Sequence, residues 1–363
     1  MLIPFTEPPR SVCLLRLSAI GDTCHVVPLL RALQDAWPDC RFTWVIGRIE
    51  QRLMRLLPEV EFIIVDKRTG WRSFAALRRA CRHRRFDLLL HLQLALRASL
   101  YASQIPARVK LGFDRPRARE LQWLFTNARI EARSREHVLD SLLGFAHSLG
   151  VSPGPPRWDI PLPKDARDYA AAALPDLLSA RPALVISACS SHAARNWRAE
   201  RYAAVAEYAI RRHGMRVLLT GGPAPIERQV ADSIIAACTE PLLDTVGQDS
   251  LPQLLAVLAR AKVLLTPDSG PAHMATLVGT PVIGLYAATN PARSGPYLSR
   301  QWCIDAYDRA ARRFAGRPAA DLAWTAKIEE PGVMDLIQVD EVCAMLDRLM
   351  SQPATSHPAN ISA

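Results

Sequence analysis

The sequence contains no C-x-x-C pair, although 8 of its 363 residues are cysteine. Disulfide frameworks and cysteine zinc sites both need closely spaced cysteines, so this scatter argues against either. The chain also lacks the roughly 18 uninterrupted apolar residues that a membrane-spanning helix needs. Its N-terminus lacks the basic and apolar segments of a signal peptide. We therefore expect a cytoplasmic protein with reduced thiols that does not cross the membrane.

Three motifs that bind phosphates or metal–phosphate complexes are absent from the sequence. Without G-x-G-x-x-G or G-x-x-x-x-G-K-[ST], a dehydrogenase or a P-loop NTPase is disfavoured. Without a D-x-D pair, the usual two-carboxylate grip on a Mg²⁺–diphosphate is missing. The charge of a leaving diphosphate would then be met by arginine, backbone amides and a helix dipole. We expect neither a metal nor a cofactor.

Length and composition favour two globular domains. The chain has 363 residues, of which 49% are hydrophobic, and domains commonly hold about 150 residues. The 45 Lys and Arg residues outnumber the 35 Asp and Glu residues, which gives a net charge of +10. Much of this excess lies in the first half of the chain. A polyanionic partner and an ordinary arginine-rich composition both account for it.

Short apolar runs alternate with helical patterns, which predicts parallel sheets with crossover helices. The expected strands are 12–17, 42–46, 61–65, 87–92, 183–187, 216–220, 263–266 and 282–285. The expected helices are 26–36, 201–212, 225–237, 251–260 and 339–350. The proline-rich stretch 150–163 separates an N-terminal domain, 1–155, from a C-terminal domain, 156–350, and a disordered tail, 351–363. We predict two doubly wound α/β domains that face a central cleft, with ligands at the carboxyl ends of the strands.

The first candidate motif, residues 16–28, lies where the first expected strand ends and a helix begins. Ser18 and Gly21 can offer backbone N–H groups in a tight turn, and Asp22 stands at the helix start. Asp22 is either an ordinary helix cap or a functional carboxylate at the ligand end of the sheet. The motif by itself leaves both interpretations open.

The second candidate motif, residues 262–297, also follows an expected strand. Asp268, Ser269 and Gly270 open a helix there, with a proline near its first position. The N–H groups and the dipole of such a helix start suit a diphosphate. His273, one turn into the helix, is either a donor to a phosphate or ribose oxygen or a buried structural histidine.

Two more loops in the second half of the chain follow expected strands. The first supplies hydroxyls from Ser190 and Ser191 and a permanent cation, Arg195, which can grip a diphosphate through two N–H groups. The second contains a Gly-Gly turn that includes Gly222, where a ligand can approach the backbone closely, and Glu227, which can accept from a ribose or base. Together with the second motif, these loops predict a nucleotide pocket in the C-terminal domain.

Two segments, SAIGDTCHVVPLLRAL and LLTPDSGPAHMATLVGTPVIGLYAATNPARSGPY, resemble those of the lipopolysaccharide heptosyltransferases of glycosyltransferase family nine. The resemblance runs over most of the chain, and LYAATNPARSGPY looks most like the heptosyltransferase I type. It implies a GT-B fold and an inverting, metal-independent transfer of heptose from ADP-heptose to the Kdo sugar of lipid A. This reaction builds the lipopolysaccharide inner core at the cytoplasmic face of the inner membrane.

The resemblance also assigns roles to the motif residues. Asp22 matches the family's general base, which takes the proton of the attacking Kdo hydroxyl. Arg195 stands where the family often has lysine, and Ser269 where it often has threonine. The expected nucleotide-sugar-binding residues are Ser190, Ser191, Arg195, Gly222, Glu227, Asp268, Ser269, Gly270 and His273.

Two basic stretches, 67–85 and 108–135, lie in the expected N-terminal domain. Their cations would meet the carboxylates of Kdo, the phosphates of lipid A and the anionic headgroups of the inner membrane, to which the protein would bind peripherally. A solvated helix face equally accounts for the first stretch. The expected acceptor-binding residues are Ser18, Gly21, Gln93, Arg97 and Arg119.

Three alternatives accompany this assignment. Nucleic-acid binding would call for aromatics interleaved with the cations, and only Trp71 and Phe74 are comparable, so no nucleic-acid partner is expected. A non-catalytic protein that binds sugar nucleotides would have the pocket without the base, and Asp22 argues against it. A heptosyltransferase II or another core-sugar transferase would have a similar nucleotide pocket, so this rival differs mainly in the acceptor.

Overall fold

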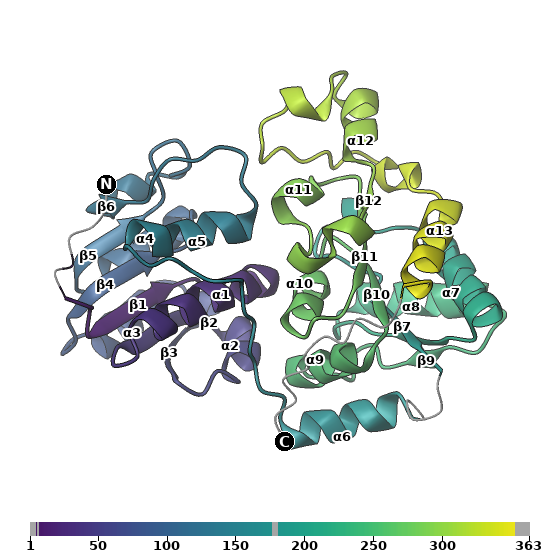
Figure 1. Cartoon of the computed structure of the whole chain (residues 1–363), viewed down its shortest axis with the longest axis horizontal. Helices are drawn as coiled ribbons and strands as arrows, with labels where there is room; N and C mark the ends of the chain where they lie inside the picture. The colour runs from purple at the N-terminus through teal and green to yellow at the C-terminus, as the bar shows by residue number, and fades with distance from the viewer. Residues whose placement is uncertain (1–4, 6, 176–180, 353–363) are drawn as a thin grey trace. The chain divides into compact units, whose positions relative to one another are not determined.

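The computed structural model describes residues 5, 7–175 and 181–352 of the chain. The chain forms two compact units, Met1–Trp158 and Asp159–Ala363, called here the N-terminal unit and the C-terminal unit (Figure 1). The division lies close to the boundary expected at 155/156, within the stretch 151–163, which contains no helix or strand. The tail expected to be disordered, 351–363, lies outside the described residues except for residues 351 and 352.

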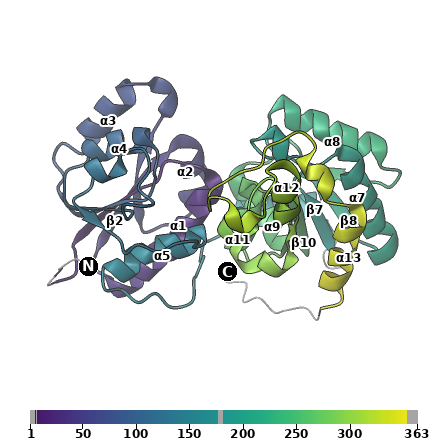
Figure 2. The ribbon, with the colours of Figure 1, turned by 90° about the horizontal axis from the view of Figure 1, so that it is seen from above.

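The N-terminal unit is a parallel six-stranded sheet with the order β3-β2-β1-β4-β5-β6. Helices α1 and α5 cover one face of the sheet, and α3 and α4 cover the other (Figure 2). The strands are β1 (Ser11–Leu15), β2 (Arg41–Gly47), β3 (Val60–Val65), β4 (Phe86–His91), β5 (Ala107–Gly112) and β6 (Ala128–Arg129). The helices are α1 (Ile20–Ala36), α2 (Arg48–Met54), α3 (Arg72–Ala80), α4 (Leu96–Ser103) and α5 (Val138–Ser148).

The central strands are nearly continuous apolar runs, because helices cover both faces of a parallel sheet. Val12 and Leu15, near the two ends of β1, are both 0% exposed. Leu15 lies opposite Val45 of β2 on one side and opposite His91 of β4 on the other. The strand order reverses at the β1/β4 pair. The loops that leave these two strands therefore run to opposite faces, and such a switch point is where open α/β sheets bind ligands.

The C-terminal unit repeats this topology, with the parallel order β12-β11-β10-β7-β8-β9 and its reversal between β7 and β10. The strands are β7 (Ala183–Ile186), β8 (Arg216–Leu219), β9 (Leu243–Asp244), β10 (Val263–Pro267), β11 (Val282–Tyr286) and β12 (Ile304–Asp305). The helices are α6 (Lys164–Ala173), α7 (Ala199–His213), α8 (Pro225–Ala237), α9 (Leu251–Arg260), α10 (Gly270–Leu277), α11 (Pro291–Ser294), α12 (Tyr307–Phe314) and α13 (Val339–Met350).

The expected elements are largely present. All eight expected strands exist with ends shifted by one or two residues, and the helices expected at 225–237, 251–260 and 339–350 have those bounds. The helix expected at 26–36 is longer, because α1 already begins at Ile20. Its first turn is stabilised by the Asp22 carboxylate, which accepts the Ala19 N–H at 3.1 Å. Across the described residues, no helix combines the length and apolar character needed to cross a membrane.

Candidate functional site

Arg16 organises the switch point of the N-terminal unit. It directly follows β1, and its guanidinium donates to Ser18 O at 2.9 Å and, across the switch point, to Leu92 O at 2.5 Å. Its remaining terminal nitrogen lies 2.5 Å from Oδ2 of Asp22. One cation, 13% exposed, therefore ties the loop after β1, the end of β4 and the Asp22 carboxylate together.

Asp22 lies in the first turn of α1, with Gly21 buried beside it. Its contacts with Arg16 and with the Ala19 N–H are both made by Oδ2. The side chain is 37% exposed, so the carboxyl group is accessible while its orientation is fixed. Helix capping and proton abstraction are thus compatible at this residue, because the cap contact does not bury the carboxylate.

The structure gathers three of the expected acceptor residues around Lys67. Lys67 Nζ lies 2.5 Å from Ser18 Oγ, and Arg97 donates to Lys67 O at 2.5 Å. Gln93 accepts the Leu17 N–H at 2.8 Å and reaches Ser18 Oγ at 3.5 Å. Sequence reasoning placed Lys67 only within a basic stretch. Burial lowers the pKa of its ammonium, and the nearby carboxylate of Glu50 partly opposes that shift.

Arg119 lies farther along, in the exposed loop between β5 and the short 3₁₀ helix η2 (Gln122–Leu124). The next residue, Glu120, accepts the Leu96 N–H at the start of α4 at 2.6 Å. This contact holds the Arg119 loop against the helix that carries Arg97. The expected acceptor residues therefore belong to neighbouring segments of one unit.

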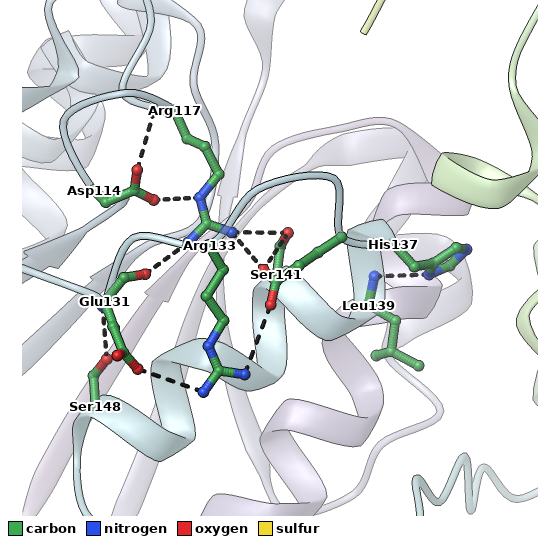
Figure 3. Close-up of polar contacts among 9 residues, drawn as sticks. Asp114, Arg117, Glu131, Arg133, His137, Leu139, Ser141 and Ser148 are labelled. Carbon is green, nitrogen blue, oxygen red and sulfur yellow. Dashed lines mark hydrogen bonds and ion pairs between the residues drawn. The ribbon is translucent and has the colours of Figure 1, made fainter. Parts of the chain in front are cut away.

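Another cation of the second basic stretch, Arg117, is held by contacts with other residues of the N-terminal unit (Figure 3). It contacts Asp114, lies 2.7 Å from Oε2 of Glu136, and donates to Ser141 Oγ at 3.1 Å and to Glu131 O at 2.9 Å. The guanidinium thus joins the loop before α5 to α5 itself. Arg117 is therefore an internal anchor within the second basic stretch, and was not among the expected acceptor residues.

The switch point of the C-terminal unit brings together the loops after β7 and β10. Ser190 Oγ donates to Asp268 O at 2.9 Å, and the Ser190 N–H donates to Asn196 at 2.7 Å. Arg195 lies 3.2 Å from Oδ2 of Asp268 and 2.9 Å from Oε1 of Glu329. Ser191 is exposed in the same turn as Ser190. Ser190, Arg195 and Asp268 therefore form one polar cluster at this switch point.

Arg195 is 11% exposed, and two carboxylates engage its terminal nitrogens. The Arg195 hydrogen bond holds the pKa of Glu329 below its usual range. Glu329 lies 134 residues away in sequence, in a stretch without a recognisable pattern, so sequence reasoning missed it. Any anion that binds Arg195 competes with Glu329 or shares the guanidinium with it.

The start of α10 is the second part of this site. Ser269 is the residue before the helix, in extended conformation, and its hydroxyl lies 2.8 Å from Thr266 Oγ1. Gly270 begins the helix, so its N–H group and that of Ser269 lie at the positive end of the helix dipole. His273 is 7% exposed within the first turn, a burial that suits a structural histidine as well as a ligand donor.

Glu227 and Gly222 lie beside this cluster, after β8. The Glu227 carboxylate accepts the Gly222 N–H at 2.6 Å, and a Cβ added at Gly222 would lie 2.8 Å from that carboxylate. A side chain at position 222 would therefore displace the Glu227 carboxylate from this contact. A small pocket adjoins these residues, lined by Ile186, Ala188, Cys189, Leu219, Thr220, Glu227, Ala231, Ile234 and Val246.

Comparisons with known proteins show the family of the chain. The model of glycosyltransferase family 9 (heptosyltransferase) matches residues 74–318. The chain is 38% identical to the lipopolysaccharide core heptosyltransferase OpsX of Haemophilus influenzae, over 95% of this chain and 98% of that protein. It is 25% identical to lipopolysaccharide heptosyltransferase 1 of Escherichia coli K12, over 80% of this chain and 92% of that protein.

Solved structures show the same fold. A glycosyl transferase of family 9 from Veillonella parvula superposes with a TM-score of 0.76 at 22% identity, covering 94% of this chain and 97% of that one. The Escherichia coli heptosyltransferase WaaC, solved with ADP, gives 0.70 at 22% identity, with coverage of 93% and 99%. The expected GT-B architecture of two Rossmann-like units is confirmed. The chain belongs to glycosyltransferase family 9, the heptosyltransferases, and is a glycosyltransferase.

Proposed function

We propose that the protein transfers heptose from ADP-heptose to the Kdo sugar of lipid A. The observation that carries this proposal is the pair of switch points, one with an oriented carboxylate and the other with a polar cluster at a helix start. The identity with a core heptosyltransferase over nearly the whole chain supports the reaction class. A related fold solved with ADP supports the adenine nucleotide.

In the proposed reaction, the acceptor hydroxyl attacks the anomeric carbon of heptose while its proton passes to Asp22. The bond from that carbon to the diphosphate breaks, ADP leaves, and the configuration at the carbon inverts. Asp22 is a sufficient base because the hydroxyl becomes acidic as the new bond forms. Arg16 is a positioning residue, since it fixes the carboxylate through Oδ2.

The C-terminal unit would stabilise the leaving diphosphate. Ser190 and Ser191 would supply hydroxyl donors, the N–H groups of Ser269 and Gly270 would supply a helix start, and Arg195 would supply the cation. Glu227 would accept from the ribose or base, with Gly222 allowing the close approach. Asp268 and His273 would complete the donor site.

We also propose that the transfer needs no metal. Among the residues described, no group of three or more His, Cys, Asp or Glu side chains is arranged to hold a metal ion. Arg195 and the α10 start provide positive charge at the diphosphate site without one. The reaction would take place at the cytoplasmic face of the inner membrane, with Gln93, Arg97 and Arg119 meeting the anionic acceptor.

One assay tests the donor, the acceptor and the metal together. Purified protein is incubated with ADP-heptose and Kdo-lipid A in EDTA, and ADP release is measured. We expect turnover with this acceptor. Loss of turnover on EDTA addition would refute the metal-free proposal. Turnover only with an acceptor that already carries heptose would instead favour a later core transferase, an alternative supported by 23% identity to heptosyltransferase 3 of Escherichia coli over 94% of this chain.

A further inference from the structure

Besides Ile49 on α2 and Ile64 on β3, the N-terminal unit exposes large apolar side chains on three further segments. Leu96 and Leu100, one turn apart on α4, are 40% and 42% exposed. Leu121 and Leu124, in and beside η2, are 50% and 59% exposed, and Trp71, before α3, is 76% exposed. A single exposed leucine is ordinary, but adjoining ones mark an interaction surface.

Contacts hold these three segments side by side. Arg97 of α4 donates to Lys67 O, four residues before Trp71, at 2.5 Å. The ring of Tyr101 on α4 stacks on Phe74 of α3, with centroids 4.1 Å apart, and the two helices are neighbours in Figure 2. The Leu96 N–H donates to Glu120 at 2.6 Å. The three segments that carry these exposed apolar side chains are therefore neighbours in the fold.

The loop that carries Leu121 has a strained backbone. Glu120 and Leu121 have φ angles of 48° and 61°, a region that costs free energy for residues other than glycine. Gln122, 0% exposed, holds the loop by donating to His91 O at 2.9 Å and Gln93 O at 3.2 Å. The buried Gln122 side chain thus stabilises an unfavourable turn, and this turn exposes Leu121 to solvent.

Arginines surround these apolar side chains. Arg115 is exposed and stacks over the Trp123 ring at 3.6 Å, and Arg72 and Arg119 are exposed next to Trp71 and the strained loop. Apolar side chains that enter the acyl boundary while cations meet headgroup phosphates are the combination that binds an anionic lipid interface. The cations would attract the surface to the membrane, and the leucines and tryptophan would anchor it there.

We propose that this region, the leucine–arginine surface, inserts into the interface of an anionic lipid bilayer. It consists of Trp71, Leu96, Leu100, Arg115, Leu121 and Leu124. The proposal rests on the proposed function, because a lipid-linked acceptor must reach Asp22 from a membrane. Lys67, whose carbonyl bonds Arg97, also reaches Ser18 Oγ at 2.5 Å. The surface therefore adjoins the loop that precedes Asp22.

The test is flotation of the full chain with vesicles of phosphatidylglycerol and phosphatidylethanolamine that contain neither lipid A nor donor. We expect the unaltered protein to float with these vesicles and to stay behind with phosphatidylcholine vesicles. The double variant Leu121→Ser/Leu124→Ser should partition about tenfold less. Trp71→Ser, in another segment, should also reduce flotation, which guards against misfolding of the loop variant. Ile235→Ser/Leu298→Ser, which alters exposed residues of the C-terminal unit at 40% and 45% exposure, is the matched control and should float normally.

Two outcomes would overturn the proposal: unaltered protein that fails to float with anionic vesicles, or both surface variants floating as well as the control. Heptose transfer is measured separately with a water-soluble, deacylated Kdo acceptor, for which the surface variants should match the unaltered protein. Flotation without any heptose transfer would reject the proposed function but would still support the membrane-binding role of the leucine–arginine surface. Heptose transfer without flotation would support the proposed function and reject the membrane-binding role of the surface.

Discussion

The two units have the same strand order, yet their switch points are built with opposite electrostatics. In the N-terminal unit, Arg16 is the central group, 13% exposed, and Asp22 is the accessible group, 37% exposed. In the C-terminal unit, the arginine, Arg195, lies between two carboxylates of Asp268 and Glu329. In both, an arginine and an aspartate lie within salt-bridge distance at the end of a central strand.

The two arginines differ in the groups to which they donate hydrogen bonds. Arg16 also donates to two backbone carbonyls, which fix its position. It therefore orients a single carboxylate, that of Asp22. Arg195 bonds only side-chain carboxylates among its described contacts, and Glu329 comes from a distant segment. A cation bound to backbone carbonyls suits the positioning of a base, whereas a cation bound to side-chain carboxylates can exchange a carboxylate for an incoming anion. Under the proposed function, the same topology would provide a base site in one unit and an anion site in the other.

The largest expected effect tests the base site. Asp22→Asn keeps an oxygen that can accept the Ala19 N–H but removes the basic carboxylate. We expect kcat to fall by about 10²–10⁴, while the Kd for ADP, measured by calorimetry, stays unchanged. Asp35→Asn is the matched control, because Asp35 lies on the same helix and is 63% exposed. An active Asp22→Asn enzyme would end the assignment of the base.

The next effect tests the anion site. Arg195→Ala removes a charged hydrogen-bond donor, so ADP should bind about 10–100-fold more weakly. Glu329→Gln removes the competing charge and should strengthen ADP binding. Arg198→Ala is the control, because Arg198 is 63% exposed and pairs with Asp335. If Glu329→Gln weakened ADP binding, Glu329 would be a supporting partner of Arg195 and the exchange model would be wrong.

A smaller effect separates positioning from chemistry. Arg16→Gln loses the cation beside Asp22 and leaves the Leu92 carbonyl without a strong donor, so kcat should fall about tenfold. Steady-state kinetics should show the loss in kcat and not in the Kd for ADP. Arg16→Lys should recover part of the rate, because lysine retains the positive charge but lacks the several fixed N–H donors of the guanidinium. A loss of ADP affinity in Arg16→Gln would contradict a role confined to the base site.

The smallest effect is on stability. Burial lowers the pKa of His91, at the end of β4, to about 3, and Lys110 and Arg16 add to the shift. Below about pH 6.5 the unfolded chain binds a proton that the folded chain excludes, so stability falls as pH falls toward 3, by at most about 1.4 kcal/mol per pH unit. Thermal midpoints at pH 7.5 and 5.5 should therefore differ less in His91→Gln than in the unaltered protein. His83→Gln, at an exposed position, should behave like the unaltered protein.

The sequence predicted the parts of each site that lie within one strand end and the helix that follows it. Asp22 and the Asp268–Gly270 turn were found because a buried apolar run, a turn and a helix start are local patterns. Lys67, Glu120 and Glu329 were not assigned roles, because their contacts join segments far apart in sequence.

Edge strands escaped prediction for a related reason. β6, β9 and β12 have only two residues each, too few for any periodic pattern. β5 alternates cations with apolar residues near the sheet edge, so it does not read as a continuous buried run. The central strands were predictable because burial on both faces demands apolar residues throughout.

The Glu329–Arg195 pair has a consequence for inhibitor chemistry. The Arg195 guanidinium already pairs with a carboxylate of the chain itself, that of Glu329, at 2.9 Å. The surroundings of the guanidinium therefore tolerate a planar monoanion. Diphosphate mimics usually carry several charges, which hinder passage across bacterial membranes. A fragment with one carboxylate in the place of Glu329 would bind the same cation with far less charge.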